Sequence, residues 1–138
     1  MRALILTLAL GWGCGGKPPD RDRDLAVAVR DFNQAVRWQN WNGAARYVDP
    51  TVRPSWLQAR LNGSRGLQLT EMQMLGMQRE GDDVVVLVSV GWFRLPDMLL
   101  RRTVWRQVWR DGAQDWMLVE ESPSQAPEQI QAEAPAWP

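Results

Sequence analysis

Residues 84–110 read VVVLVSVGWFRLPDMLLRRTVWRQVWR, and this stretch decides the fold of the chain. Its first part, Val84 to Leu95, is rich in β-branched and aromatic residues, which favour strands. Pro96 and Asp97 then supply turn-forming residues. From Met98 to Arg110, the side chains at odd-numbered positions differ sharply from those at even-numbered positions. This alternation is typical of a strand with two unlike faces. The short connection predicts that the two strands are antiparallel neighbours.

The alternation in the second strand separates two faces of different character. One face carries Leu99, Arg101, Thr103, Trp105, Gln107 and Trp109, and the other carries Leu100, Arg102, Val104, Arg106, Val108 and Arg110. Burying unpaired arginines is costly, so we expect the arginine face to meet solvent and the tryptophan face to be covered by helices. Arg102, Arg106 and Arg110 could form an anion-binding stripe. We favour a solvated face paired with acids such as Glu71 and Glu120.

Two further strands flank this pair. The segment LQLTEMQMLGMQ predicts a strand over 67–78, which the turn EGDD joins to the first strand above. DWMLVEES, residues 115–122, follows the turn DGAQ and predicts the last strand. Met72 and Met74 share one face of the strand over 67–78. We expect them to fill gaps in the core, with the lining of an apolar ligand site as the alternative.

The residues before the strands show helical periodicity instead. In DLAVAVRDFNQAVRW, one stripe holds Leu25, Ala28 or Val29, Phe32, Ala35 and Val36, which predicts an amphipathic helix with Asp22 or Asp24 as its N-cap. A short second helix is expected after Asn42 as N-cap, and a third over Pro54 to Leu61. Helices followed by strands predict an α+β domain, in which N-terminal helices pack on one face of a curved, antiparallel four-stranded meander.

The N-terminus predicts export and anchoring. Arg2 and the apolar run Ala3 to Gly13 form a signal peptide over 1–13, too short to span a bilayer. Gly13 followed by Cys14 resembles the lipobox of bacterial lipoproteins, in which the cysteine is acylated and becomes the mature N-terminus. By this resemblance, Gly15 in place of aspartate favours the outer membrane, with the protein facing the periplasm. An ordinary secretory signal with an incidental cysteine is the alternative.

Composition predicts where the folded domain begins and ends. It also argues against binding of nucleic acid, metals and cofactors. Residues 14–23 are predicted to be a lipidated cysteine and flexible tether, 24–122 the folded domain, and 123–138 a disordered tail rich in Pro, Ala, Gln and Glu. The net charge is zero, which gives no basic field for nucleic acid. The chain has no histidine, and we find no metal-binding cluster, phosphate loop or cofactor motif. We therefore expect no cofactor and no metal.

The helix, the segment WNGAARYVDP (41–50) and the tryptophan-rich strands ending in DWMLVEES resemble the nuclear transport factor two-like superfamily. This superfamily includes the cyclase-like and ketosteroid-isomerase-like proteins. The resemblance covers 24–122 and implies a cone-shaped α+β fold with a pocket between helices and sheet. This sequence shows no sign of the hairpin that many members place between the early helices. We therefore expect a reduced version of the superfamily fold. The residues that we expect near such a pocket are Phe32, Met72, Met74, Trp105 and Trp109.

Some members of this superfamily use an Asp or His base in the pocket, whereas others only bind ligands or partners. Asp31 and Asp49 are the acids best placed to face inward, but periodicity places Asp31 on the polar side of its helix and Asp49 in a turn. We therefore expect a non-catalytic, lipid-anchored envelope protein that binds a partner protein or a small apolar ligand. A small cyclase- or isomerase-type enzyme and a structural accessory of an envelope complex are the alternatives.

Overall fold

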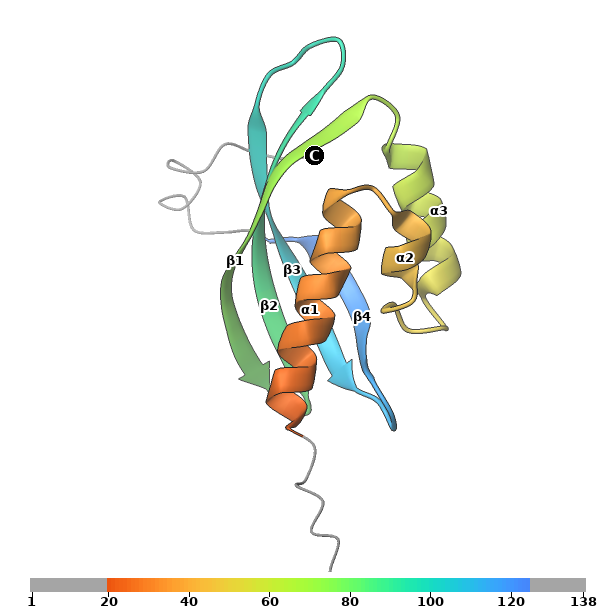
Figure 1. Ribbon diagram of the computed structural model, residues 1–138, viewed down its shortest axis with the longest axis vertical. Coiled ribbons are helices and arrows are strands. Elements are labelled where there is room, and N and C mark those ends of the chain that lie inside the picture. The colour runs from red at the N-terminus through yellow and green to blue at the C-terminus, as the bar shows by residue number, and fades with distance from the viewer. Residues whose placement is uncertain (1–19, 125–138) are drawn as a thin grey trace, which may run out of the picture.

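The structure is a computed structural model, and it describes residues 20–124. The expected signal peptide, Cys14 and residues 125–138 of the expected tail lie outside the described residues. The elements in chain order are α1 (Arg21–Arg37), α2 (Trp41–Ala45), α3 (Arg53–Gly63), β1 (Leu67–Glu80), β2 (Asp83–Arg94), β3 (Arg101–Asp111) and β4 (Trp116–Pro123). The predicted α+β class is confirmed: three helices lie on one side of a curved sheet whose strand order is β1-β2-β3-β4 (Figure 1).

Helix α1 forms as the periodicity predicts, with Leu25, Val29, Phe32 and Val36 buried toward the sheet. The predicted cap was wrong, because the Asp20 side chain accepts a hydrogen bond from the Arg23 backbone N–H at 3.2 Å. Asp22 and Asp24 lie in the first turn, where their negative charge complements the helix dipole. Residues 21–23, predicted to belong to the tether, are therefore helical.

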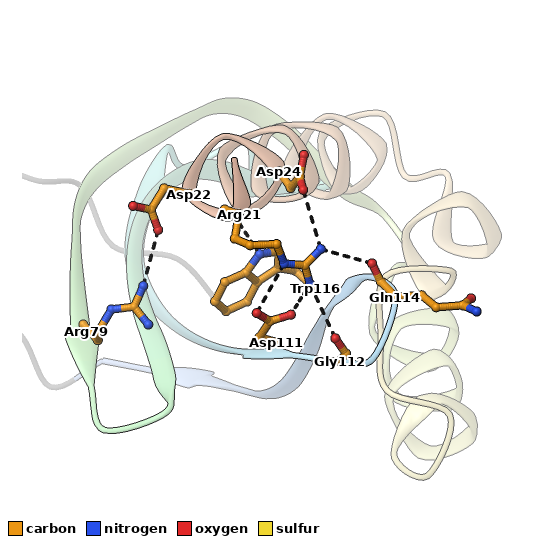
Figure 2. Close-up of polar contacts among 8 residues, drawn as sticks. All are labelled: Arg21, Asp22, Asp24, Arg79, Asp111, Gly112, Gln114 and Trp116. Atoms are coloured by element: carbon orange, nitrogen blue, oxygen red, sulfur yellow. Dashed lines mark hydrogen bonds and ion pairs between the residues drawn. The ribbon is translucent and has the colours of Figure 1, made fainter. Parts of the chain in front are cut away.

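The start of α1 is fastened to the turn between β3 and β4 (Figure 2). The Arg21 guanidinium forms an ion pair with Asp111 and donates to the Gln114 carbonyl at 3.2 Å. The indole N–H of Trp116 donates to the Arg21 carbonyl at 2.9 Å. Beside this cluster, Arg79 at the end of β1 pairs with Asp22 at 3.3 Å. These contacts hold one end of α1 against the sheet.

The short helix α2 is capped by Asn40, not by Asn42 as predicted. The Asn40 side chain accepts a hydrogen bond from the Gly43 N–H at 3.0 Å. A Cβ at position 43 would lie only 2.5 Å from the Asn40 side-chain nitrogen, so this cap requires glycine. Beyond α2, a parallel bridge joins Val48 to Leu118, in which the Asp49 N–H donates to the Leu118 carbonyl at 2.8 Å. Within the described residues, the segment that connects α1 to β1 contains this one bridge and no strand. It therefore has no hairpin between the early helices, as the sequence predicted.

The four strands form the predicted antiparallel meander, but three irregularities alter its phase. The register shifts between Leu69 and Glu71 and between Met74 and Gly76 on β1, and at Val108/Trp109 where β3 meets β4. The predicted strand start at Met98 was three residues early, because residues 95–100 form an exposed loop. Bulges of this kind bend a strand and re-aim its side chains. They contribute to the curvature of the sheet, along one side of which α1 lies in Figure 1.

The predicted assignment of the two faces of β3 is confirmed. Trp109 is fully buried beneath α1, where its ring meets Phe32 edge-on with centroids 5.6 Å apart. On the opposite face Arg102 pairs with Glu71, Arg106 with Glu80 and Glu120, and Arg110 with Asp83. The predicted partners Glu71 and Glu120 are thus present, and this face is a row of cross-strand ion pairs.

Met74 does not fill the core as expected. Its side chain is 53 % exposed, whereas Met72 is partly buried against the core. Beyond Met72, β1 is exposed at every residue to its end, because this half of an edge strand is not covered by the helices. In the part of the chain that the structure describes, no helix is both long and apolar enough to cross a bilayer.

Candidate functional site

A cavity of about 520 Å³ lies between α3 and the inner face of the sheet. Its walls are mainly apolar and come from every helix and strand. They include Val36, Trp41, Trp56, Leu69, Met72, Val90, Trp105 and Leu118. The volume falls within the range of small-molecule sites, roughly 300–1,000 Å³.

Small, exposed residues of α3 line the outer edge of the cavity. Ser55, Ala59 and Gly63 are spaced four residues apart, which places them on one face of the helix, and all three line the cavity. No residue of α3 is fully buried. The helix therefore covers the sheet without filling the space beneath it. The bulky residues of α3 that line the cavity, Trp56 and Arg60, extend toward β3 and β4 instead.

A buried polar cluster forms part of the cavity wall. The Glu121 side chain is only 4 % exposed and forms an ion pair with Arg60. Its Oε1 also accepts a hydrogen bond from the Trp56 indole N–H at 3.3 Å, and its Oε2 accepts one from the Gln107 amide at 3.1 Å. Both oxygens of this carboxylate are therefore occupied by donors from three different side chains.

The amide of Gln107 extends this cluster into the core. Its Nε2 donates to the Asn33 side chain at 2.8 Å, and its Oε1 accepts from the Trp109 indole N–H at 3.4 Å. Gln107 is 1 % exposed, and each of its polar atoms has a partner. A buried polar network of this kind is stable only when its members are satisfied. The cluster joins α1 and α3 to the last two strands.

The guanidinium of Arg60 lies between two aromatic rings. Its central carbon is 5.3 Å from the Trp56 ring centroid and 4.8 Å from that of Trp105. Burial lowers the pKa of Arg60 to about 10, so the side chain still carries its charge at neutral pH. Two rings and one carboxylate thus compensate a cation that is largely removed from water.

Glu121 was missed in the sequence because of a β-bulge. Trp116 and Leu118 face the core, so strict alternation would place Glu120 inside and Glu121 outside. However, Trp109 pairs with Leu118 and Val108 with Glu120, which leaves Val119 as an extra residue on β4. The phase reverses after this bulge, so Glu121 lies opposite Gln107 and Glu120 pairs with Arg106 outside. The buried glutamine on the tryptophan face was the one signal that a polar partner was needed.

The structure divides the five expected pocket residues among three places. Trp105 and Met72 line the cavity. Phe32 and Trp109 are fully buried in the core, where Phe32 also packs at 5.7 Å against the cavity residue Trp56. Met74 lies with Met72 at a second hollow, of about 420 Å³, between α1 and β1.

The two acids considered as bases lie elsewhere, as their local patterns predicted. Asp31 is on the outer side of α1, where its carboxylate pairs with Arg30 at 2.8 Å. Asp49 accepts hydrogen bonds from the backbone N–H and hydroxyl of Thr51, which lower its pKa. In residues 20–124, no group of three or more potential ligands is arranged to hold a metal ion.

The sequence matches no protein-family model and no curated protein. Solved structures with the same fold include a ketosteroid isomerase-like protein from Erwinia carotovora atroseptica, with TM-score 0.61, 9 % identity, and coverage of 78 % of this chain and 98 % of that one. An NTF2-like protein from Cytophaga hutchinsonii gives TM-score 0.56, 14 % identity, and coverage of 77 % and 98 %. A SEC-C motif containing protein from Rhodopseudomonas palustris gives TM-score 0.59, 15 % identity, and coverage of 71 % and 77 %. The chain therefore has the nuclear transport factor two-like fold.

Proposed function

We propose that this domain binds a small apolar ligand in the cavity beneath α3 and does not act on it chemically. The observation that carries the proposal is an apolar cavity of about 520 Å³ between α3 and the inner face of the sheet. Concave apolar sites with a few convergent polar groups are typical of ligand binding. Here Arg60, whose side chain is 22 % exposed and which Glu121 holds in place, can orient a polar end of the ligand.

A cyclase- or isomerase-type enzyme is the second candidate, because a buried carboxylate lines the cavity. A general base needs a lone pair within reach of the substrate proton. Three donors, from Arg60, Trp56 and Gln107, already occupy most of the acceptor positions of the Glu121 carboxylate. Proton uptake by Glu121 would leave the Arg60 charge buried without its counterion, which is costly. The contacts therefore favour binding over catalysis.

Ligand binding can be tested with the neutral fluorescent probe N-phenyl-1-naphthylamine, titrated into the full chain. We expect saturable fluorescence enhancement. Ala59→Trp adds a large ring at a position that lines the cavity and should reduce affinity at least tenfold. Gln58→Trp adds the same ring to the adjacent, exposed position on α3 and should leave binding unchanged. Equal affinity in both variants would place the probe outside the cavity and overturn the proposal.

We further propose that the protein is a lipoprotein anchored through Cys14 to the periplasmic side of the bacterial outer membrane. The supporting features are Arg2, the apolar run Ala3 to Gly13, and Cys14 as the only cysteine. Acylation would account for a single cysteine in an exported chain. Cys14→Ser should release the protein from membranes or leave it unprocessed. Wild-type protein that fractionates with the soluble proteins and carries a free thiol would contradict this.

A further inference from the structure

The loop between β2 and β3 exposes an unusual amount of apolar surface. Leu95, Met98, Leu99 and Leu100 are between 50 % and 66 % exposed. They lie within six consecutive residues, 95–100, which we call the apolar tip. Clustered apolar side chains on a soluble surface mark a site of interaction more often than scattered ones do.

Cations surround the base of the apolar tip. Arg65, Arg94, Arg101 and Arg102 flank it, and the nearby carboxylates are Asp97, which pairs with Arg101, and Glu71, which pairs with Arg102. The Arg94 guanidinium donates to the carbonyls of Gly63 and Arg65 at 3.1 and 2.7 Å, contacts that fix its position and leave its charge in place. The tip is thus apolar at its end and carries a surplus of positive charge at its base.

The apolar tip adjoins the ligand cavity. The Leu95 N–H donates to the Gly66 carbonyl at 2.9 Å, which ties the tip to the segment between α3 and β1. Gly63, Leu67 and Arg94, on either side of this contact, line the cavity. Figure 1 shows that the loop lies at the opposite end of the molecule from the start of α1. A contact made by the tip is therefore distant from Arg21, at the start of α1.

We propose that the apolar tip inserts into the interface of a lipid bilayer that contains anionic lipids. Segments that bind at this interface combine apolar side chains, which enter the acyl boundary, with arginines that meet the headgroups. Leu95, Met98, Leu99 and Leu100 supply the first component, and the surplus arginines supply charge complementarity to anionic lipid. Where the proposed ligand-binding function also holds, the cavity lies beside the bilayer and its ligand is a membrane-soluble molecule.

The test places an environment-sensitive nitrobenzoxadiazole label at the tip, through Leu99→Cys in the full chain carrying Cys14→Ser. Vesicles contain phosphatidylethanolamine and phosphatidylglycerol, about seven to three. We expect a blue shift, together with quenching by spin-labelled lipids. The same label at Asn42→Cys, on the exposed side of α2, should show neither change. This readout is local, so insertion of residues 1–13 cannot mimic it.

Two further variants make the proposal specific. Arg65→Gln should weaken binding to anionic vesicles roughly fivefold, as expected for one arginine near a charged surface. With the label moved to Met98→Cys, the change Leu99→Ser together with Leu100→Ser should abolish the blue shift. Circular dichroism would confirm that these exposed substitutions leave the fold intact.

Three outcomes would overturn the proposal. The first is no vesicle-dependent change at position 99. The second is a blue shift without vesicles that grows with protein concentration, which would assign the tip to a second copy of the chain. The third is a concentration-independent blue shift without vesicles, which would mean that another part of the chain covers it. Because N-phenyl-1-naphthylamine binding is measured separately, failure of membrane insertion and failure of ligand binding can be told apart.

Discussion

Glu120 and Glu121 are adjacent in β4, yet they form the same type of ion pair in opposite environments. Glu121 pairs with Arg60 inside the cone, where its side chain is 4 % exposed. Glu120 pairs with Arg106 on the outer face, where its side chain is 60 % exposed. Exposed pairs contribute about 0–1 kcal/mol because water and salt screen them. A buried pair costs several kcal/mol to desolvate, so the intact pair adds little net stability. Removal of one partner is nevertheless strongly destabilising, because it leaves the other charge buried and unpaired.

The difference assigns separate roles to the two faces of the sheet. On the outer face, arginine stems cover Val104 and Val108 while their charged ends are paired and solvated. This keeps a wide sheet surface soluble without a second layer. On the inner face, one ion pair and one glutamine fix polar groups beside an otherwise apolar cavity. Polar groups that are held in place in this way give a ligand site orientation and specificity.

The largest contrast is expected between Glu121→Ala and its neighbour Glu120→Ala. The first change leaves Arg60 without its carboxylate and should destabilise the fold by about 3 kcal/mol, near the lower limit for buried pairs because the Arg60 side chain is still 22 % exposed. The second should cost less than about 1 kcal/mol. Urea unfolding measures both. Equal losses would mean that the two faces do not differ as described.

A double substitution tests whether the inner pair stabilises the fold or only avoids an unpaired charge. Arg60→Met with Glu121→Gln removes both charges and keeps a side-chain oxygen at position 121 to accept a hydrogen bond from Trp56 or Gln107. Stability should return to within about 1–2 kcal/mol of the wild type, because no buried charge is left uncompensated. If the double variant is as unstable as Glu121→Ala, the pair itself stabilises the fold, and the comparison must be revised.

The outer arginines should respond to salt and the inner one should not. Arg106→Gln removes a cation paired with Glu80 and Glu120 and should cost less than about 1 kcal/mol. That loss should shrink further as salt is raised toward about 1 M, where screening acts within a few ångströms. Thermal unfolding at low and high salt gives this result. A loss from Arg106→Gln that exceeds the loss from Glu121→Ala would reverse the assignment of the faces.

The smallest effect is expected at the exposed cluster of Figure 2, and it depends on pH. Hydrogen bonding from Arg21 lowers the pKa of Asp111 below its usual 3.8. The ionised carboxylate is therefore favoured in the folded state, and its contribution is present above pH 3.8 and lost as pH falls through the lowered pKa. Asp111→Asn should slightly reduce the urea midpoint at pH 7, and the difference from the wild type should shrink as the pH falls below 3.8. A midpoint difference that persists in acid would exclude this linkage.

Element order and the two faces of β3 could be predicted from the sequence because their signals repeat. Helical periodicity from Leu25 to Val36 extends over several turns, and the segregation of tryptophan from arginine extends along most of β3. One residue that departs from such a pattern does not obscure it, because many other positions follow it. The same holds for the acids Asp31 and Asp49, whose local surroundings predicted their place outside the cavity.

The candidate site depends on features of single residues, such as a bulge or a cap. A repeating sequence pattern does not reveal such features. One extra residue at Val119 reverses the phase of β4 and brings Glu121 inside. The N-caps were misplaced by two residues or more, since several side chains in DRDRD and NWN could cap and only backbone geometry selects Asp20 and Asn40. The cavity is lined by residues from every helix and strand, so no single stretch of sequence predicts it before α3 is placed over the sheet.

The central claim is that the inner face forms a ligand site built around Arg60 and Glu121. Its most direct test follows the indole N–H signals of the tryptophans by NMR while 1-decanol is titrated into the full chain. The account predicts saturable shifts for Trp56, whose N–H binds Glu121, and for Trp105, which stacks on Arg60. Trp38, exposed at the end of α1, should not move. Shifts confined to Trp38, or no shift in Trp56 and Trp105, would contradict the account.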